Sequence, residues 1–131
     1  MTVYLGLDYG RAHIGTALAE RSLATPLTTI KNTSRAEVIA HLSRYISDHK
    51  IEAIVCGVPE GELKSEIEAF SHELENVCNI PVVLHPETLS SQEAIAKLRE
   101  GGASHKKLQN DHAYAAVLIL EDYLDQGSVV I

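Results

Sequence analysis

Apolar and polar side chains alternate along the N-terminal part of the chain, as they do in half-buried β-strands. One alternating run ends at the acid Asp8 and a second begins after Gly10, with one face made of Val3, Leu5 and Leu7, then Ile14, Thr16 and Leu18. Glycine favours a tight reversal, so the two runs predict a β-hairpin with Asp8 at its bend. Packing gives little reason for a carboxylate there, which makes Asp8 the first candidate for an active-site residue.

Beyond the hairpin, the pattern changes to helices that alternate with short strands. A turn at residues 22–24 precedes a third alternating run, with Pro26 at the first residue of the strand or at a sheet edge. Ser34 and Glu37 form a capping box ahead of apolar residues at helical spacing. Two continuous apolar runs are typical of parallel strands covered on both faces. The predicted elements are a strand at 26–31, a helix at 35–49, a strand at 51–58, a helix at 63–77 and a strand at 80–84.

Two more helices are predicted towards the C-terminus. A capping pattern at Ser90–Glu93 opens a helix that Gly101–Gly102 ends, residues 103–109 form a polar, basic loop, and a final helix begins at about Asn110. This order predicts an α/β fold: a mixed five-stranded sheet of three antiparallel meander strands plus two parallel strands, with helices on both faces. At 131 residues and 45% apolar composition, one domain over 1–131 is expected.

Composition narrows the function classes. No apolar run approaches the ~18 residues that cross a bilayer, and the N-terminus shows no signal-peptide pattern, so a cytoplasmic protein without membrane contact is expected. Cys56 and Cys78 are the only cysteines and lack CxxC spacing, which favours buried thiols over a zinc site or a disulfide.

The net charge of −7 is unusual for a nucleic-acid-binding domain, because phosphate neutralisation needs a basic surface. A local basic patch is still available. Arg11 and His13 lie beside the Asp8 turn, and Lys106 and Lys107 lie in the predicted late loop ahead of a helix N-terminus, where a phosphate backbone can be held. The alternative for the two lysines is an ordinary solvated loop.

Three acids follow or begin predicted elements: Asp8 after the first strand, Glu87 after the last strand, and Asp111 at the start of the last helix. In an open α/β sheet such positions converge on one edge, so we expect the three to meet. Mg²⁺ binds through one or two carboxylates together with phosphate oxygens, and two ions about 3.5–4 Å apart can hydrolyse a phosphodiester.

Each acid also has a structural interpretation. Asp8 can cap its turn, Glu87 can be a first-turn helix charge, and Asp111 can be an N-cap. His85 and His112 flank the acids and are candidates for a general base or an extra metal ligand, or for a surface or packing role. The joint placement of the three acids favours the functional interpretation.

Four segments together resemble a known family: residues 5–17 around Asp8, residues 54–59, residues 81–90 around Glu87, and residues 115–124. In this order they resemble the YqgF (RuvX) family, described as Holliday-junction-resolvase-like proteins and as pre-16S rRNA nucleases. The resemblance implies an RNase H-like fold and phosphodiester hydrolysis that depends on Mg²⁺ or Mn²⁺. It also implies cytoplasmic trimming of the 5′ end of 16S rRNA precursor, or action on branched nucleic acid.

The resemblance carries over two acids directly and leaves the third open. Asp8 matches the strand-end acid of the family, and Glu87 matches the acid of its Asp-Glu-Arg-Leu-Ser/Thr motif. The family usually has Asp three residues before an Ala-Ala pair, a position that His112 occupies here, with Asp111 one place earlier. The sequence also departs from the family at three positions: Pro86 stands for Asp, Thr88 for Arg, and His13 for the usual Lys or Arg.

Three functions remain open at this point. The leading one is a metal-dependent nuclease in which Asp8, Glu87 and Asp111 or His112 hold the ions and the loop around Lys106 positions RNA; a homodimer is one assembly it allows. The second is a catalytically weakened module that binds RNA or a protein partner. The third, an actin-like nucleotide binder, shares the first motif but needs a second domain.

Overall fold

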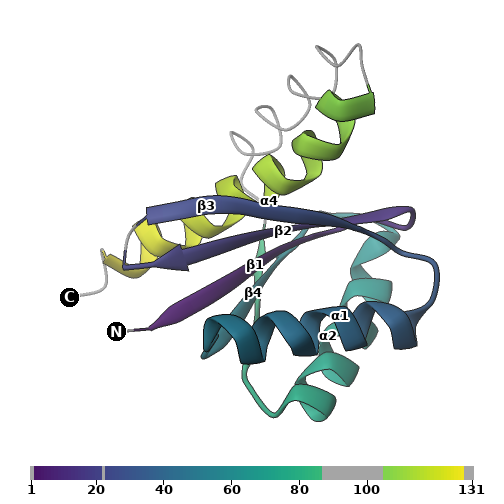
Figure 1. The fold of residues 1–131 in the computed structure, drawn as a ribbon, viewed down its shortest axis with the longest axis horizontal. Helices are drawn as coiled ribbons and strands as arrows, with labels where there is room; N and C mark the ends of the chain where they lie inside the picture. The colour runs from purple at the N-terminus through teal and green to yellow at the C-terminus, as the bar shows by residue number, and fades with distance from the viewer. Residues whose placement is uncertain (1, 22, 87–104, 129–131) are drawn as a thin grey trace.

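The structure is a computed structural model and describes residues 2–21, 23–86 and 105–128, with side chains from residue 112 to residue 125 in the last of these ranges. Five strands, β1 to β5, form one sheet, with helices α1, α2 and α4 around it (Figure 1). The described elements are β1 (Val3–Tyr9), β2 (His13–Glu20), β3 (Leu23–Lys31), α1 (Arg35–His49), β4 (Ala53–Val58), α2 (Leu63–Cys78), β5 (Val82–Pro86) and α4 (His105–Ser128).

The sheet has the strand order β3-β2-β1-β4-β5. β1 pairs antiparallel with β2, and β2 pairs antiparallel with β3, whereas β1, β4 and β5 run parallel. This confirms the predicted mixed sheet of three meander strands and two parallel strands. Because β1 is central, the end of β1 that carries Asp8 has a neighbouring strand on both sides.

The two faces of the sheet have different cores. Alternate positions of β1, including Leu5 and Leu7, pack into a large apolar cluster with residues of α1 and α2, such as Leu42 and Phe70. The opposite face is lined mostly by small residues and is covered by α4 (Figure 1). Helices therefore cover both faces, as predicted.

Two glycines let α4 approach the sheet closely. A Cβ at Gly6 would lie 2.5 Å from Cγ of Leu120, and a Cβ at Gly15 would overlap the carbonyl group of His112 and lie 2.8 Å from the Ala113 nitrogen. At Gly15 the obstacle is helix backbone, which cannot rotate away as a side chain can. Gly15 is thus required for α4 to sit where it does.

Several predicted boundaries are confirmed or shifted only slightly. α1 spans the predicted residues, and the Ser34 hydroxyl accepts a hydrogen bond from the Glu37 amide at 3.2 Å, as the capping pattern indicates. α2 runs one residue further than predicted, and β4 and β5 each begin two residues later. Cys56 is buried and Cys78 half-buried, and no disulfide joins them.

Two predictions about local structure are wrong. β3 begins at Leu23, so residues 23–24 belong to this strand and not to the turn predicted at 22–24. Pro26 therefore lies inside β3. It is tolerated there because β3 is an edge strand and its pairing with β2 shifts register nearby, between Thr16 and Ala17. α4 begins at His105, so residues 105–109 are helix and not loop. No Gly or Pro interrupts residues 105–126, so the composition of this stretch permits a helix that begins at His105.

The helix predicted over 90–100 and its glycine stop lie outside the described residues. α4 continues to Ser128, which shortens the C-terminal tail predicted from residue 127.

We expect Gly15→Ala to destabilise the protein by about 3 kcal/mol, the upper part of the range for overpacking, because the new methyl group meets the backbone of α4. Gly6→Ala should cost less, because its nearest obstacle is the Leu120 side chain. Urea unfolding of both variants measures this order. A Gly15→Ala protein as stable as the wild type would contradict the close packing of α4.

Candidate active site

Asp8 lies at the end of the central strand β1 and is only 6% exposed. Side chains alternate along β1, so Asp8 is on the same face as Tyr4 and Gly6, the face that α4 covers. Its backbone partner in β2 is Gly15, the residue over which the backbone of His112 passes. The fold thus brings a residue of the C-terminal helix to the N-terminal acid.

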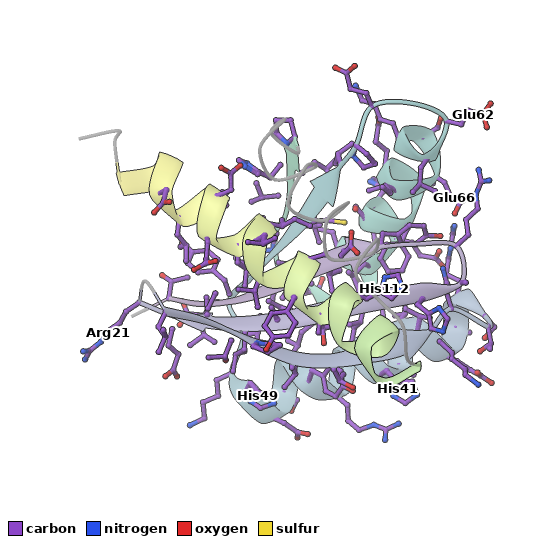
Figure 2. All side chains as sticks on the ribbon, turned by 90° about the horizontal axis from the view of Figure 1, so that it is seen from above. Arg21, His41, His49, Glu62, Glu66 and His112 are labelled. Carbon is purple, nitrogen blue, oxygen red and sulfur yellow. The ribbon has the colours of Figure 1, made fainter. Side chains whose placement is uncertain are left out.

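The Asp8 and His112 side chains meet at this point. His112 Nδ1 lies 3.6 Å from Asp8 Oδ2, an ion-pair separation that is too long for a hydrogen bond. The His112 ring also stacks on the ring of His13, with centroids 5.4 Å apart and an interplanar angle of 26°. Figure 2 shows His112 on α4 above the sheet. The stack and the close helix packing fix the direction of the imidazole.

His112 Nδ1 is buried and has no hydrogen-bond partner among the residues that the structure describes. A buried polar atom without a partner is costly, so such an atom calls for an explanation such as a bound ion or water. A carboxylate oxygen and an imidazole nitrogen that face each other are both ligands that divalent metal ions accept. These two residues therefore fit a metal ion, although no cluster of three or more metal-ligating side chains is found in residues 2–21, 23–86 and 112–125.

The other predicted site residues are placed less completely. Glu87 lies outside the described residues. Asp111, Lys106 and Lys107 belong to the helical backbone of α4, so Asp111 is not an N-cap and the lysines are not in a loop, both of which correct the predictions. Their side chains are outside the described set. The ligand set of Asp8, Glu87 and Asp111 or His112 remains a prediction.

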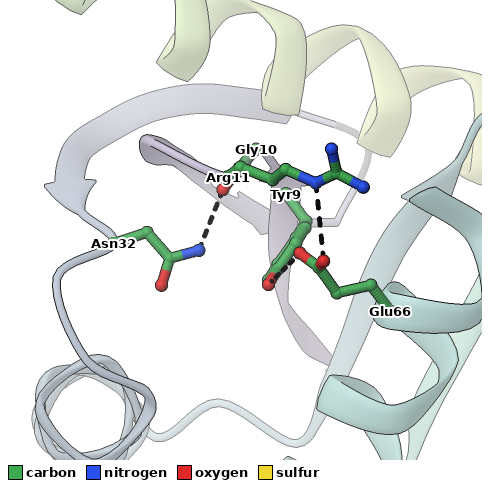
Figure 3. Close-up of polar contacts among 5 residues, drawn as sticks. All are labelled: Tyr9, Gly10, Arg11, Asn32 and Glu66. Atoms are coloured by element: carbon green, nitrogen blue, oxygen red, sulfur yellow. Dashed lines mark hydrogen bonds and ion pairs between the residues drawn. The ribbon is translucent and has the colours of Figure 1, made fainter. Parts of the chain in front are cut away.

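A network that the sequence did not predict holds the turn after Asp8 (Figure 3). The Tyr9 hydroxyl donates to Glu66 Oε2 at 2.8 Å, and Arg11 Nε lies 3.5 Å from Glu66 Oε1. From the other side, Asn32 Nδ2 donates to the Gly10 carbonyl at 2.9 Å. Glu66 of α2 and Asn32 after β3 thus tie the turn to two distant segments, and no local pattern in the sequence signals this pairing.

Comparison with known proteins identifies the family. A family model described as "RuvX: Holliday junction resolvase" matches residues 2–126. The chain belongs to the RuvX family. Curated relatives include a "Putative pre-16S rRNA nuclease" of Anaeromyxobacter sp. (strain Fw109-5), 37% identical over 93% of this chain and 96% of the relative, and one of Rickettsia conorii, 34% identical over 92% of this chain and 84% of the relative. The predicted class of enzyme, a nuclease acting on phosphodiester bonds, is the class of this family.

Solved structures confirm the fold of this RuvX family member. T. thermophilus RuvC in complex with a Holliday junction substrate superimposes with a TM-score of 0.65 at 14% identity, covering 98% of this chain and 96% of RuvC. The Fowlpox virus resolvase in complex with Holliday junction DNA gives a TM-score of 0.58 at 14% identity, covering 99% and 100%. The predicted RNase H-like fold is therefore confirmed.

Of the helices that the structure describes, none combines the length and apolar character of a bilayer span.

Arg11 and His13, both predicted to contact nucleic acid, have different surroundings. The Arg11 side chain is 65% exposed, and only its Nε is joined to Glu66 (Figure 3). His13 is taken up in the stack with His112. Arg11 is thus accessible to a phosphate group, whereas His13 chiefly supports the imidazole of His112.

His85 was a candidate for a base beside the acids, but its side chain faces elsewhere. It is 6% exposed, its Nε2 lies 2.8 Å from Asp122 Oδ2 of α4, and its ring meets the edge of Tyr123 with centroids 5.8 Å apart. This contact joins the edge strand β5 to α4, so His85 has a structural role in this RuvX chain.

A hollow of about 310 Å³ lies near the carboxyl ends of β4 and β5. Its lining is mainly apolar and comprises Val58, Pro59, Glu60, Lys64, Leu84 and Pro86.

We expect Asp122→Ala to lower the free energy of unfolding by roughly 1–3 kcal/mol, because it leaves a buried histidine nitrogen without its partner. Asp122→Asn keeps a side chain that can hydrogen-bond His85 and should cost less. Glu121→Ala, at an exposed neighbouring position, is the control and should change stability little. Equal stability of the alanine and asparagine variants in urea unfolding would argue against the bond.

Burial raises the pKa of Tyr9 above its ordinary value of 10.0; Glu66 adds to the rise and Asn32 opposes it. Below pH 10 the tyrosine is protonated in the folded and the unfolded chain. Above that value the unfolded chain ionises first, so Tyr9 contributes stability that is lost as pH rises through its folded-state pKa.

We therefore expect the urea-unfolding free energy of the wild type to fall as the pH rises past the unfolded-state pKa of about 10, and to fall less steeply in Tyr9→Phe. Removal of the hydroxyl should also cost about 1 kcal/mol near neutral pH, through the lost bond to Glu66. Parallel pH profiles for the two proteins would contradict the assignment.

Proposed function

We propose that this chain is a divalent-metal-dependent nuclease, folded as one domain over residues 1–131, that processes the 5′ end of 16S rRNA precursor in the cytoplasm. The observation that carries the proposal is the Asp8 carboxylate, nearly buried at the end of the central strand and facing the unpartnered nitrogen of His112. The names of the curated relatives supply the substrate class.

The burial of Asp8 supports a role beyond packing. An ionised carboxylate with little solvent contact needs a cation or hydrogen-bond donors around it, and a protein core gains nothing from such a group. Asp8 is instead placed at an open end of the parallel strands, where ligand sites of α/β sheets lie. A carboxylate at this place is within reach of a ligand, and its oxygens are of the type that divalent ions bind.

The proposed metal ligands are Asp8, Glu87 and one residue of α4. Glu87 comes next in the sequence after β5, a strand that runs parallel to β4 and therefore in the same direction as β1. Adjacent residues of a helix differ by about 100° in direction, and His112 is the one observed to face Asp8, which favours His112 over Asp111 as the third ligand. When bound, a divalent ion would lower the pKa of a water molecule and offset the charge of the leaving oxygen.

The chain's own residues orient the substrate. Lys106 and Lys107 stand in the first turn of α4, where the helix dipole adds to their positive charge and attracts a phosphate. Arg11 presents its free guanidinium nitrogens beside the Asp8 turn, held there by Glu66. His13 keeps the His112 ring in place.

Precursor RNA is the proposed partner, and branched DNA is the alternative substrate. The proposal allows a homodimer.

The second candidate is a catalytically weakened module that binds RNA or a protein partner. The replacement of the usual third Asp of the family by His112, together with a net charge of −7, is the observation behind it. Calorimetry with Mn²⁺ separates the candidates: a nuclease binds the ion at millimolar concentration or below, whereas a non-catalytic module does not need to.

We expect Asp8→Asn to remove cleavage of a 16S precursor transcript carrying its 5′ extension, because the neutral amide no longer holds the metal ion. The loss should reach at least about a hundredfold, the scale of removing one preorganised charge from an active site. Asp48→Asn on the exposed side of α1 is a matched control and should retain full activity. Circular dichroism should show both variants folded. Undiminished cleavage by Asp8→Asn would refute the proposed site.

A further inference from the structure

We infer that His112 makes the metal site of this chain selective for Mn²⁺ over Mg²⁺, by supplying an imidazole nitrogen as a direct ligand beside Asp8. The inference rests on the proposed function, since it concerns the ion that the same site would hold. It goes beyond that function because a carboxylate at this position would not distinguish the two ions in the same way.

The separation of the two side chains fits a shared ion better than a direct bond. Asp8 Oδ2 and His112 Nδ1 are 3.6 Å apart, beyond hydrogen-bond distance. With metal–ligand bonds of about 2.1 Å, two ligands of one ion lie roughly 3.0 Å apart at right angles and roughly 4.2 Å apart when opposite, and 3.6 Å falls between these limits. The nitrogen is buried and lacks a hydrogen-bond partner in the described part of the chain, so an ion at this point would satisfy an atom that is otherwise left unpaired.

The direction in which His112 Nδ1 points is fixed by contacts with β2 and with the His13 ring. The backbone of His112 lies against Gly15, which removes freedom from the start of the side chain. The His13 ring stacks on the imidazole and limits rotation of the ring. A ligand that is held in place before the ion arrives loses little conformational entropy on binding.

The chemistry of the donor decides the selectivity. Mg²⁺ is a hard ion that prefers oxygen ligands and retains its water molecules. Transition-metal ions accept imidazole nitrogen, and Mn²⁺ is the one among them that also favours carboxylate oxygen. A site with one carboxylate and one imidazole in contact therefore favours Mn²⁺. Nδ1 can serve as the ligand only in the neutral ring, with the proton on Nε2.

The first test uses the wild-type protein loaded with Mn²⁺. Electron spin echo envelope modulation of the bound ion should show coupling to the nitrogen of a directly coordinated imidazole, and the coupling should change when the histidines are labelled with ¹⁵N. Calorimetry should show Mn²⁺ bound roughly tenfold or more tightly than Mg²⁺, the scale expected for exchanging one ligand atom. Bound Mn²⁺ without nitrogen coupling would overturn the inference.

Variants assign the nitrogen to its residue. His112→Asp should lose the nitrogen coupling and reduce the preference for Mn²⁺ by about tenfold, because an oxygen ligand suits Mg²⁺. His13→Phe keeps an aromatic ring for stacking and removes both nitrogens, so its nitrogen coupling should persist. Loss of coupling in His13→Phe together with its retention in His112→Asp would refute the role of His112.

The outcomes separate this inference from the proposed function. If neither ion binds at millimolar concentration, the metal-dependent nuclease is refuted and the inference falls with it. If both ions bind with equal affinity and Mn²⁺ shows no nitrogen coupling, the nuclease stands and only the role of His112 is refuted.

Discussion

The backbone of α4 passes directly over Gly15 of β2, and the rest of the candidate site depends on this contact. A side chain at that position would overlap the carbonyl of His112 and move the helix away from the sheet. Because Gly15 is the β2 partner of Asp8, the helix meets the sheet beside the acid. A residue from the C-terminal part of the chain is thereby brought to the end of the central strand.

The turn after Asp8 is held by residues of α2 and of the segment that follows β3. Tyr9 and Arg11 both bind Glu66, and Asn32 holds the Gly10 carbonyl, so α2 and the segment after β3 fix the turn. An acid at a freely moving turn would be a poor metal ligand, since ordering it on binding costs conformational entropy. Here the contacts with Glu66 and Asn32 already order the turn before any ligand binds, as in a preorganised site.

The distribution of charge reconciles an acidic chain with a nucleic-acid substrate. The net charge of −7 describes the whole chain, whereas phosphate recognition depends on the local field. Acids such as Glu68, Glu73 and Glu75 lie on α2, on the sheet face opposite α4. The lysine pair is in the first turn of α4. Part of the negative charge therefore lies on the face of the sheet away from α4.

The sequence by itself determined the strands, the helices of the first two thirds and the candidate Asp8, because period-two and helical spacing, the capping box and the glycine turn are local signals. The sequence alone misplaced the start of α4, because a polar stretch such as residues 105–109 is equally typical of a loop and of an exposed helix face. Only the tertiary structure decided that His112 faces Asp8, that His85 binds Asp122 and that Glu66 holds the turn. These pairs join segments far apart in the chain, and their geometry follows from how closely α4 and α2 pack on the sheet, which no local pattern records.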